Sequence, residues 1–171
     1  MRHREQINCP YETRHPPRSG GSALIEIDDP FDKDEFIVLS IGGNDFALRG
    51  EMNPTEILRY VRKVIQFYKS KGIKAERIIY FTPYSPTGLM KFAVAVTCRG
   101  NLSNLYRQYV QEAEQMCAEE NVTCMALDFF GDEERANPGT GIPEPTPYGA
   151  WKLAKMVQEK VCEIMQKEER S

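Results

Sequence analysis

Polar and glycine residues follow three apolar segments of the chain, where an α/β protein usually does its chemistry. These stretches are residues 42–46 (Gly-Gly-Asn-Asp-Phe), 82–86 (Thr-Pro-Tyr-Ser-Pro) and 128–132 (Asp-Phe-Phe-Gly-Asp). Because parallel sheets bind ligands beyond the carboxyl ends of their strands, we expect the three stretches to meet at one edge. Residues 139–146, ahead of the last predicted helix, are expected to join them as a loop.

A serine nucleophile needs a base to accept its proton and a third group to orient that base. The only two histidines, His3 and His15, lie in a Pro- and Gly-rich stretch at the start of the chain. Ser19 and Ser22 lie there too, with no apolar strand ahead of them to form a rigid elbow. We therefore expect no conventional serine–histidine pair.

Metal and cofactor sites have no clear signature. The five cysteines are odd in number and show no close ligand spacing, which favours reduced thiols: Cys9, Cys98, Cys117, Cys124 and Cys162. No Gly-rich phosphate loop or Walker-type lysine follows a predicted strand, which disfavours a flavodoxin-like phosphate binder. We expect neither a metal nor a cofactor.

Three strands are predicted to position these stretches. Residues 36–41 (Phe-Ile-Val-Leu-Ser-Ile) form a continuous apolar run, typical of a central strand buried on both faces of a parallel sheet. Residues 77–82 and 122–127 are similar. Residues 23–27 fit either a helix end or a further strand.

Three amphipathic helices are also predicted. The first is capped by Asn53, has a proline at its first position and stops at Gly72. The second shows its apolar face between Leu102 and Met116. The third is capped by Thr146, and its predicted inner face is Ala150, Leu153, Ala154, Val157, Val161 and Ile164.

Alternation of strands and helices predicts right-handed βαβ units and a parallel sheet, hence an α/β fold. We expect residues 1–22 to form a loose N-terminal arm and residues 23–171 to form one domain.

Two motifs resemble those of the SGNH (GDSL-type) hydrolases. Residues 37–45 (Ile-Val-Leu-Ser-Ile-Gly-Gly-Asn-Asp) resemble the family's block of a buried strand leading into Gly-x-Asn-Asp. Residues 145–154 (Pro-Thr-Pro-Tyr-Gly-Ala-Trp-Lys-Leu-Ala) resemble the segment after its catalytic histidine. The resemblance covers the chain from about Glu35 to the last helix. It implies a flavodoxin-like three-layer α/β sandwich, incomplete at its N-terminus.

The resemblance also implies roles for individual residues. Asn44 matches the asparagine whose amide polarises an ester carbonyl in the oxyanion hole, and Gly43 and Asp45 flank it as binding residues. Residues 18–22 resemble the block whose glycine donates to the oxyanion, which assigns Gly21 to the same site. In the alternative interpretation, Asn44 only holds its loop together by hydrogen bonds.

The catalytic residues of the family are replaced. Gly-Asp-Ser occurs nowhere in the chain, and Gly141 and Glu144 occupy the positions of the catalytic aspartate and histidine. An exposed glutamate, with a pKa near 4.3, is a weak base for a serine proton at neutral pH. We expect an SGNH-like relative of carboxylic ester hydrolases with impaired catalysis, or alternatively a non-catalytic scaffold that acts as a binding or interaction module.

Composition narrows the partners. With 22 basic and 25 acidic residues interspersed, no phosphate-binding patch stands out, so nucleic acid is not expected. No apolar run is long enough to span a membrane, and no secretory signal follows Met1, so we expect a cytoplasmic protein, or a secreted one if a signal segment precedes this sequence. If the protein is active, we expect a small ester or acylated substrate. The family's absent first strand would lie beside residues 36–41, so we also expect a homo-oligomer or another partner that covers this sheet edge.

Overall fold

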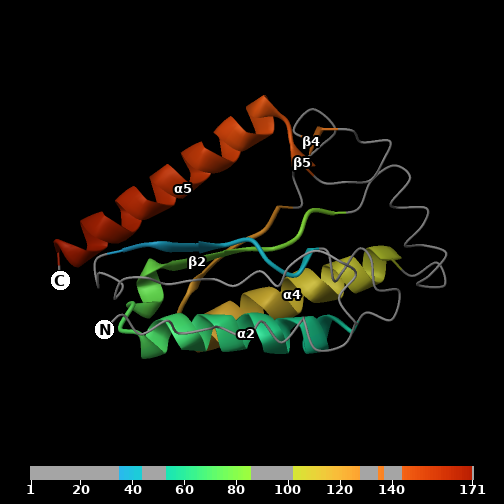
Figure 1. Cartoon of the computed structure of the whole chain (residues 1–171), viewed down its shortest axis with the longest axis horizontal. Helices are drawn as coiled ribbons and strands as arrows, with labels where there is room; N and C mark the ends of the chain where they lie inside the picture. The colour runs from blue at the N-terminus through green and yellow to red at the C-terminus, as the bar shows by residue number, and fades with distance from the viewer. Residues whose placement is uncertain (1–34, 44–52, 86–101, 128–134, 137–143, 171) are drawn as a thin grey trace, which may run out of the picture.

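The computed structural model describes residues 35–43, 53–85, 102–127, 135–136 and 144–170, and Figure 1 shows their arrangement. Their fold is mixed α/β. Strands β1 (Ile37–Leu39), β2 (Ile78–Phe81) and β3 (Thr123–Met125) form a parallel sheet in the order β1-β2-β3. The order of strands and helices confirms the predicted alternation.

Helix α2 (Pro54–Ser70) has the predicted ends. The Asn53 side chain accepts a hydrogen bond from the backbone N–H of Thr55 at 3.1 Å, and Pro54 needs no acceptor at the first position. At the other end, Gly72 has a φ of 95°, and the N–H of Ile73 donates to the carbonyl of Tyr68 at 3.2 Å. This is a Schellman motif, which satisfies carbonyls that the helix leaves unpaired.

Helices α4 (Leu102–Glu120) and α5 (Pro147–Glu168) are the other two described helices longer than one turn. The Thr146 hydroxyl accepts from the N–H of Gly149 at 3.1 Å, so the predicted cap of α5 is confirmed. A 3-10 turn, η2 (Ala75–Arg77), precedes β2, so that strand begins one residue later than predicted.

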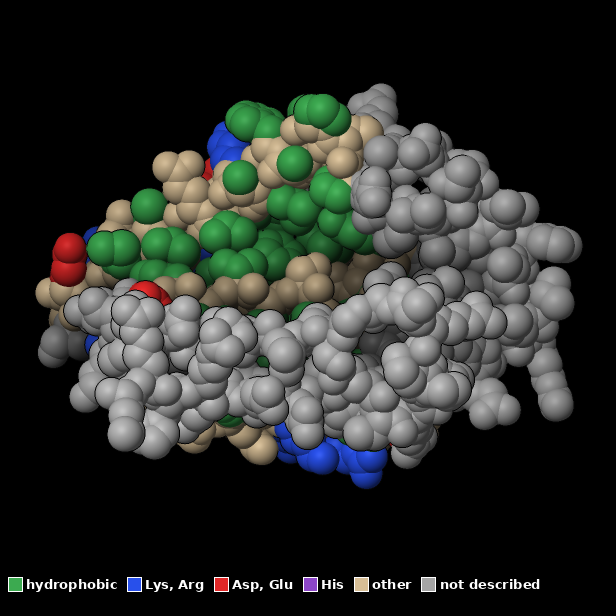
Figure 2. Space-filling view, in the orientation of Figure 1, with side chains coloured by type: hydrophobic (Ala, Val, Ile, Leu, Met, Phe, Trp, Pro, Cys, Tyr) green, Lys and Arg blue, Asp and Glu red, His purple; other side chains and the backbone are tan. Residues whose placement is uncertain are grey.

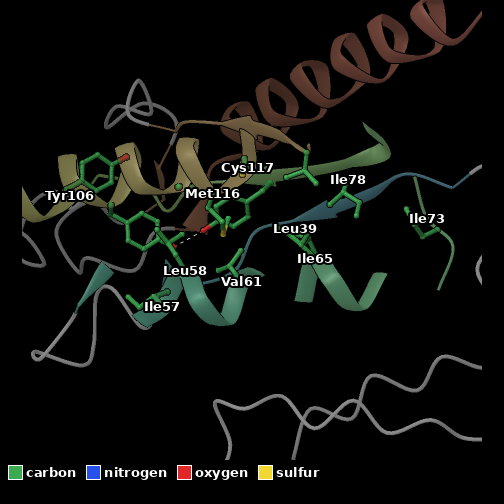
Figure 3. Close-up of a cluster of buried hydrophobic side chains, with 14 residues drawn as sticks. Leu39, Ile57, Leu58, Val61, Ile65, Ile73, Ile78, Tyr106, Met116 and Cys117 are labelled. Atoms are coloured by element: carbon green, nitrogen blue, oxygen red, sulfur yellow. Dashed lines mark hydrogen bonds between the residues drawn. The ribbon is translucent and has the colours of Figure 1, made fainter. Parts of the chain in front are cut away.

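Helices α2 and α4 pack together on one face of the sheet, and α5 crosses the other face (Figure 1). The side chains between α2, α4 and the sheet form the larger core cluster, which includes Leu39, Val61, Ile65, Ile78 and Tyr109 (Figure 3). The smaller cluster joins Ile79, Phe81 and Leu127 to Ile164 of α5. Burial of both sheet faces at β2 makes it the strand most enclosed by helices.

Strand β1 differs from the expected central strand. Within the described residues it pairs only with β2, and Val38 remains 45% exposed. The cause is the position of α5, whose buried contacts are with Ile79, Phe81 and Leu127. Leu39 is buried on the opposite face, so the prediction of burial on both faces was wrong.

Two further elements were not predicted. β4 (Arg135–Ala136) and β5 (Glu144–Pro145) pair antiparallel just ahead of α5. Residues 1–22 and 23–27 lie outside the described part of the chain. Among the described helices, none is long and apolar enough to cross a membrane.

Candidate functional site

The carboxyl end of β1 turns at a glycine that no other residue could replace without strain. Gly42 is buried and has a φ of 95°, which L side chains rarely adopt. A Cβ there would lie 2.7 Å from the hydroxyl oxygen of Tyr109 and 3.1 Å from Cγ2 of Ile57. Gly42 therefore lets helices α2 and α4 approach the strand end closely.

Two buried tyrosines hold this strand end. The hydroxyl of Tyr80, on β2, donates to the carbonyl of Ile41 at 3.2 Å and lies 2.7 Å from the hydroxyl of Tyr109, on α4 (Figure 3, dashed line). Since Tyr80 donates to Ile41, the Tyr109 hydroxyl donates to Tyr80. Burial, followed by the interaction with Tyr109, raises the pKa of Tyr80 well above its ordinary value, so this hydroxyl is a neutral structural donor.

The end of β2 is tied to the same helix. Tyr106, one turn before Tyr109 on α4, donates to the carbonyl of Pro83 at 3.0 Å. A Cβ built on Gly43 would lie 3.6 Å from Cβ of Pro83, an ordinary van der Waals contact. The ends of β1 and β2 therefore lie side by side, as the sequence predicted, and both are anchored to α4.

The end of β3 is linked to β2 through a buried threonine. The N–H of Thr82 donates to the carbonyl of Met125 at 3.0 Å, and its hydroxyl accepts from the N–H of Leu127 at 3.1 Å. Thr82 thus extends the parallel pairing beyond the strands. All three strand ends are held at one edge of the sheet, with fixed backbone positions.

The structure tests the predicted site residues only in part. Gly43 is half-buried at this edge, directly beside Pro83. Asn44 and Asp45, the next two residues, lie outside the described residues, as does Gly21. Tyr84 and Ser85 follow β2 and are half-buried, and Tyr84 packs against the cluster beneath α5.

Glu144 lies in a short strand, which corrects the expectation that residues 139–146 form a loop throughout. It is the first residue of β5 and pairs with Ala136 of β4, two residues ahead of Thr146, the cap of α5. This ladder fixes its backbone at the start of α5. Gly141 lies outside the described residues.

Sequence reasoning missed the three tyrosines that anchor the edge. Tyr80 was assigned to a strand, and Tyr106 and Tyr109 to the apolar face of a helix, although each carries a hydroxyl that needs a partner when buried. The spacing of the two α4 tyrosines, three residues apart on one face, was the available signal.

A separate hollow of about 930 Å³ lies on the outer side of α2 and α4, lined by residues including Asn53, Arg59 and Gln115. Its polar groups largely bind one another: the Thr55 hydroxyl donates to Glu112 at 2.8 Å, and Arg62 forms an ion pair with Glu119. These contacts join the two helices and need no ligand. Among the described residues, no cluster of His, Cys, Asp and Glu could hold a metal ion.

Comparison with known proteins adds no relative: no protein-family model matches the chain, and no curated protein matches it.

Proposed function

We propose that this chain is an SGNH (GDSL-type) hydrolase-like protein with the flavodoxin-like sandwich of that family, related to carboxylic ester hydrolases and impaired in catalysis. The observation that carries the proposal is the anchored end of β1. The glycine pair of the Gly-Gly-Asn-Asp motif lies where a parallel sheet presents ligand-binding residues, and Asn44 is the next residue.

The rigidity of this edge supports an oxyanion-binding role for Asn44. Donors that stabilise an oxyanion must be aligned before the charge develops, because reorganising them during the reaction would cost free energy. The backbone leading to Asn44 is held by the hydrogen bond from the Tyr80 hydroxyl to the carbonyl of Ile41. A neutral acyl group is the ligand class that such an amide would bind.

Impaired catalysis follows from the sequence around the second motif. Glu144 stands where the family has its histidine, and a carboxylate accepts a serine proton poorly at neutral pH. Neither histidine of the chain lies near the motifs in sequence. We expect binding of an ester or acyl group with little or no turnover.

The test measures binding and turnover separately. Ligand-observed NMR would follow binding of a short-chain acyl ester, and release of nitrophenol from the corresponding nitrophenyl ester would follow hydrolysis. Asn44→Ala removes the proposed donor, and Glu144→Ala removes the proposed histidine substitute. Asn104→Ala, an exposed asparagine on α4, is the matched control.

Ester binding that is lost in Asn44→Ala and kept in Asn104→Ala would support the proposal. Turnover lost in both Asn44→Ala and Glu144→Ala would show that catalysis is retained and that Glu144 is its base, which contradicts the impairment. A folded protein with neither binding nor turnover would contradict the ester-binding site altogether. Circular dichroism of each variant establishes folding.

A second candidate, a non-catalytic interaction module, is favoured by the exposure of Val38 on β1. Within the described residues β1 has one strand neighbour, and a strand with a free edge can pair with another chain. Figure 2 shows hydrophobic side chains gathered between α5 and the sheet on this face. Self-association that depends on this strand would support the module.

A further inference from the structure

Two cysteines are brought together by the turn that joins α4 to β3. At this turn Asn121 has a φ of 62°. The N–H of Val122 donates to the carbonyl of Cys117 at 2.9 Å, and the N–H of Asn121 donates to the carbonyl of Ala118 at 3.2 Å. These are the two hydrogen bonds of a Schellman motif, which places Val122 against Cys117. The turn therefore sets the start of β3 at a fixed distance from the last turn of α4.

Cys124 lies two residues beyond Val122 and shares its face of the strand. Its register partner on β2 is Tyr80, a member of the cluster between α4 and the sheet, and Cys124 packs against that same cluster. Cys117 belongs to the cluster from the helix side and is 1% exposed. The two thiols thus face each other across the helix–sheet interface.

The interaction between the two thiols is the largest influence on the pKa of each. It raises the pKa of Cys117 and lowers the pKa of Cys124, so Cys124 is the thiol that ionises first. Cys124 is also the less buried of the two. Thiolate character and access are the two properties that make a cysteine reactive, and they coincide at Cys124.

We propose that Cys117 and Cys124 form a dithiol oxidation site, at which a peroxide closes a disulfide between α4 and β3. In the first step, Cys124 Sγ attacks one peroxide oxygen, the O–O bond breaks, and Cys124 sulfenic acid and a water are formed. In the second, Cys117 Sγ attacks Cys124 Sγ, the S–O bond breaks, and a second water leaves with the Cys117 proton. The two thiols lose two electrons, which reduce one peroxide to two waters.

The disulfide would form beside the tyrosine pair that anchors β1. Tyr80 is the register partner of Cys124 and interacts electrostatically with both thiols. Formation of the disulfide would therefore change the electrostatic surroundings of the Tyr80 hydroxyl. The inference does not depend on the proposed ester site, since it rests on the thiols alone.

The experiment treats the full chain with hydrogen peroxide, blocks the remaining thiols with N-ethylmaleimide and digests it with a glutamate-specific protease. Cleavage after Glu119 and Glu120 separates Cys117 from Cys124, so their peptides stay together only through a disulfide. Mass spectrometry should find the linked pair, and reduction should release it. The pair should be lost in Cys124→Ser and kept in Cys162→Ser, which removes an exposed thiol of α5.

A second probe avoids reliance on the variants. Phenylarsine oxide binds two neighbouring thiols through one arsenic with loss of one water, so the native chain should retain one such adduct on the Cys117 and Cys124 peptides. Recovery of both cysteines as separately alkylated peptides, with no linked pair and no arsenic bridge, would overturn the proposal. Disulfides from either residue only to Cys9, Cys98 or Cys162 would overturn it equally.

Discussion

At the scale of single residues, the end of β1 depends on a position where a methyl group cannot fit. The Gly42→Ala substitution would place Cβ 2.7 Å from the Tyr109 hydroxyl, with the backbone at a φ of 95°. The left-handed backbone and the overpacking together should lower the free energy of unfolding by roughly 2–4 kcal/mol. Urea denaturation followed by circular dichroism measures this loss.

Gly43→Ala is the matched control, since its Cβ would lie 3.6 Å from Pro83 in an ordinary contact. Its cost should stay below about 1 kcal/mol. Combining Gly42→Ala with Tyr109→Phe removes the hydroxyl that the new methyl group meets, so the cost of the glycine substitution should fall by about 1 kcal/mol. If Gly42→Ala and Gly43→Ala lowered the free energy of unfolding equally, a methyl group at Gly42 would not be specifically excluded by the backbone conformation and the Tyr109 hydroxyl.

The hydroxyl of Tyr80 gives a second prediction at this scale. Tyr80→Phe leaves the carbonyl of Ile41 and the hydroxyl of Tyr109 each without this buried partner, so the free energy of unfolding should fall by about 1–3 kcal/mol. Tyr60→Phe, at a less buried position on α2, should cost less than about 0.5 kcal/mol. Thermal or urea unfolding distinguishes the two, and similar costs would show that the buried hydroxyl pair contributes little.

At the scale of elements, the sequence predicted what is decided locally. The caps at Asn53 and Thr146 and the stop at Gly72 were found because a helix end is set by its own few residues. On α5, Leu153, Val157, Val161 and Ile164 pack inward as predicted, whereas Ala150 and Ala154 are exposed. Alanine fits either face, so its side of a helix depends on the neighbouring element.

Non-local contacts account for what the sequence did not predict. The Tyr80–Tyr109 pair joins residues 29 positions apart, and the β4–β5 ladder involves only two residues in each strand. Neither leaves a periodic pattern in the sequence. Of the candidate site, sequence reasoning located Gly43 at the strand end but had no means of finding the hydroxyls that hold it.

The last turn of α5 gives a prediction at the element scale. Glu168 accepts hydrogen bonds from Arg77 and Lys74, which join α5 to the turn before β2 and hold the pKa of Glu168 at about 2. A lowered carboxyl pKa stabilises the folded state above the ordinary pKa, and this stabilisation is lost as the pH falls. The stability difference between wild type and Glu168→Gln should therefore be largest near neutral pH and shrink from about pH 4.5 towards about pH 2.

Urea midpoints measured across this pH range would provide the test. Glu169→Gln, the exposed neighbour that caps the helix, is the control and should follow wild type throughout. A Glu168→Gln difference that is independent of pH would mean that the ion pair with Arg77 does not contribute.

At the scale of the whole molecule, helices cover the two faces of the described sheet unequally. Helices α2 and α4 bury the β1 residue Leu39, whereas α5 lies over β2 and the end of β3 and leaves Val38 45% exposed. Trp151 is 57% exposed on α5 and stacks on Tyr148 at 6.0 Å. Large apolar side chains are therefore exposed both on α5 and on β1, and the second edge of β1 has no strand partner within the described residues.

An apolar strand whose second edge has no strand partner among the described residues should drive concentration-dependent association of the chain. Val38→Lys adds a charge to the middle of β1 on its exposed face, and natural edge strands use lysine in this way to prevent pairing. Light scattering after size exclusion should show wild type shifting to a larger species as its concentration rises and Val38→Lys remaining smaller. Ser40→Lys, at an exposed polar position just past the strand, should behave like wild type. If all three proteins stay monomeric at every concentration, this strand is not an interface between copies, and the interaction-module candidate loses the observation that favours it.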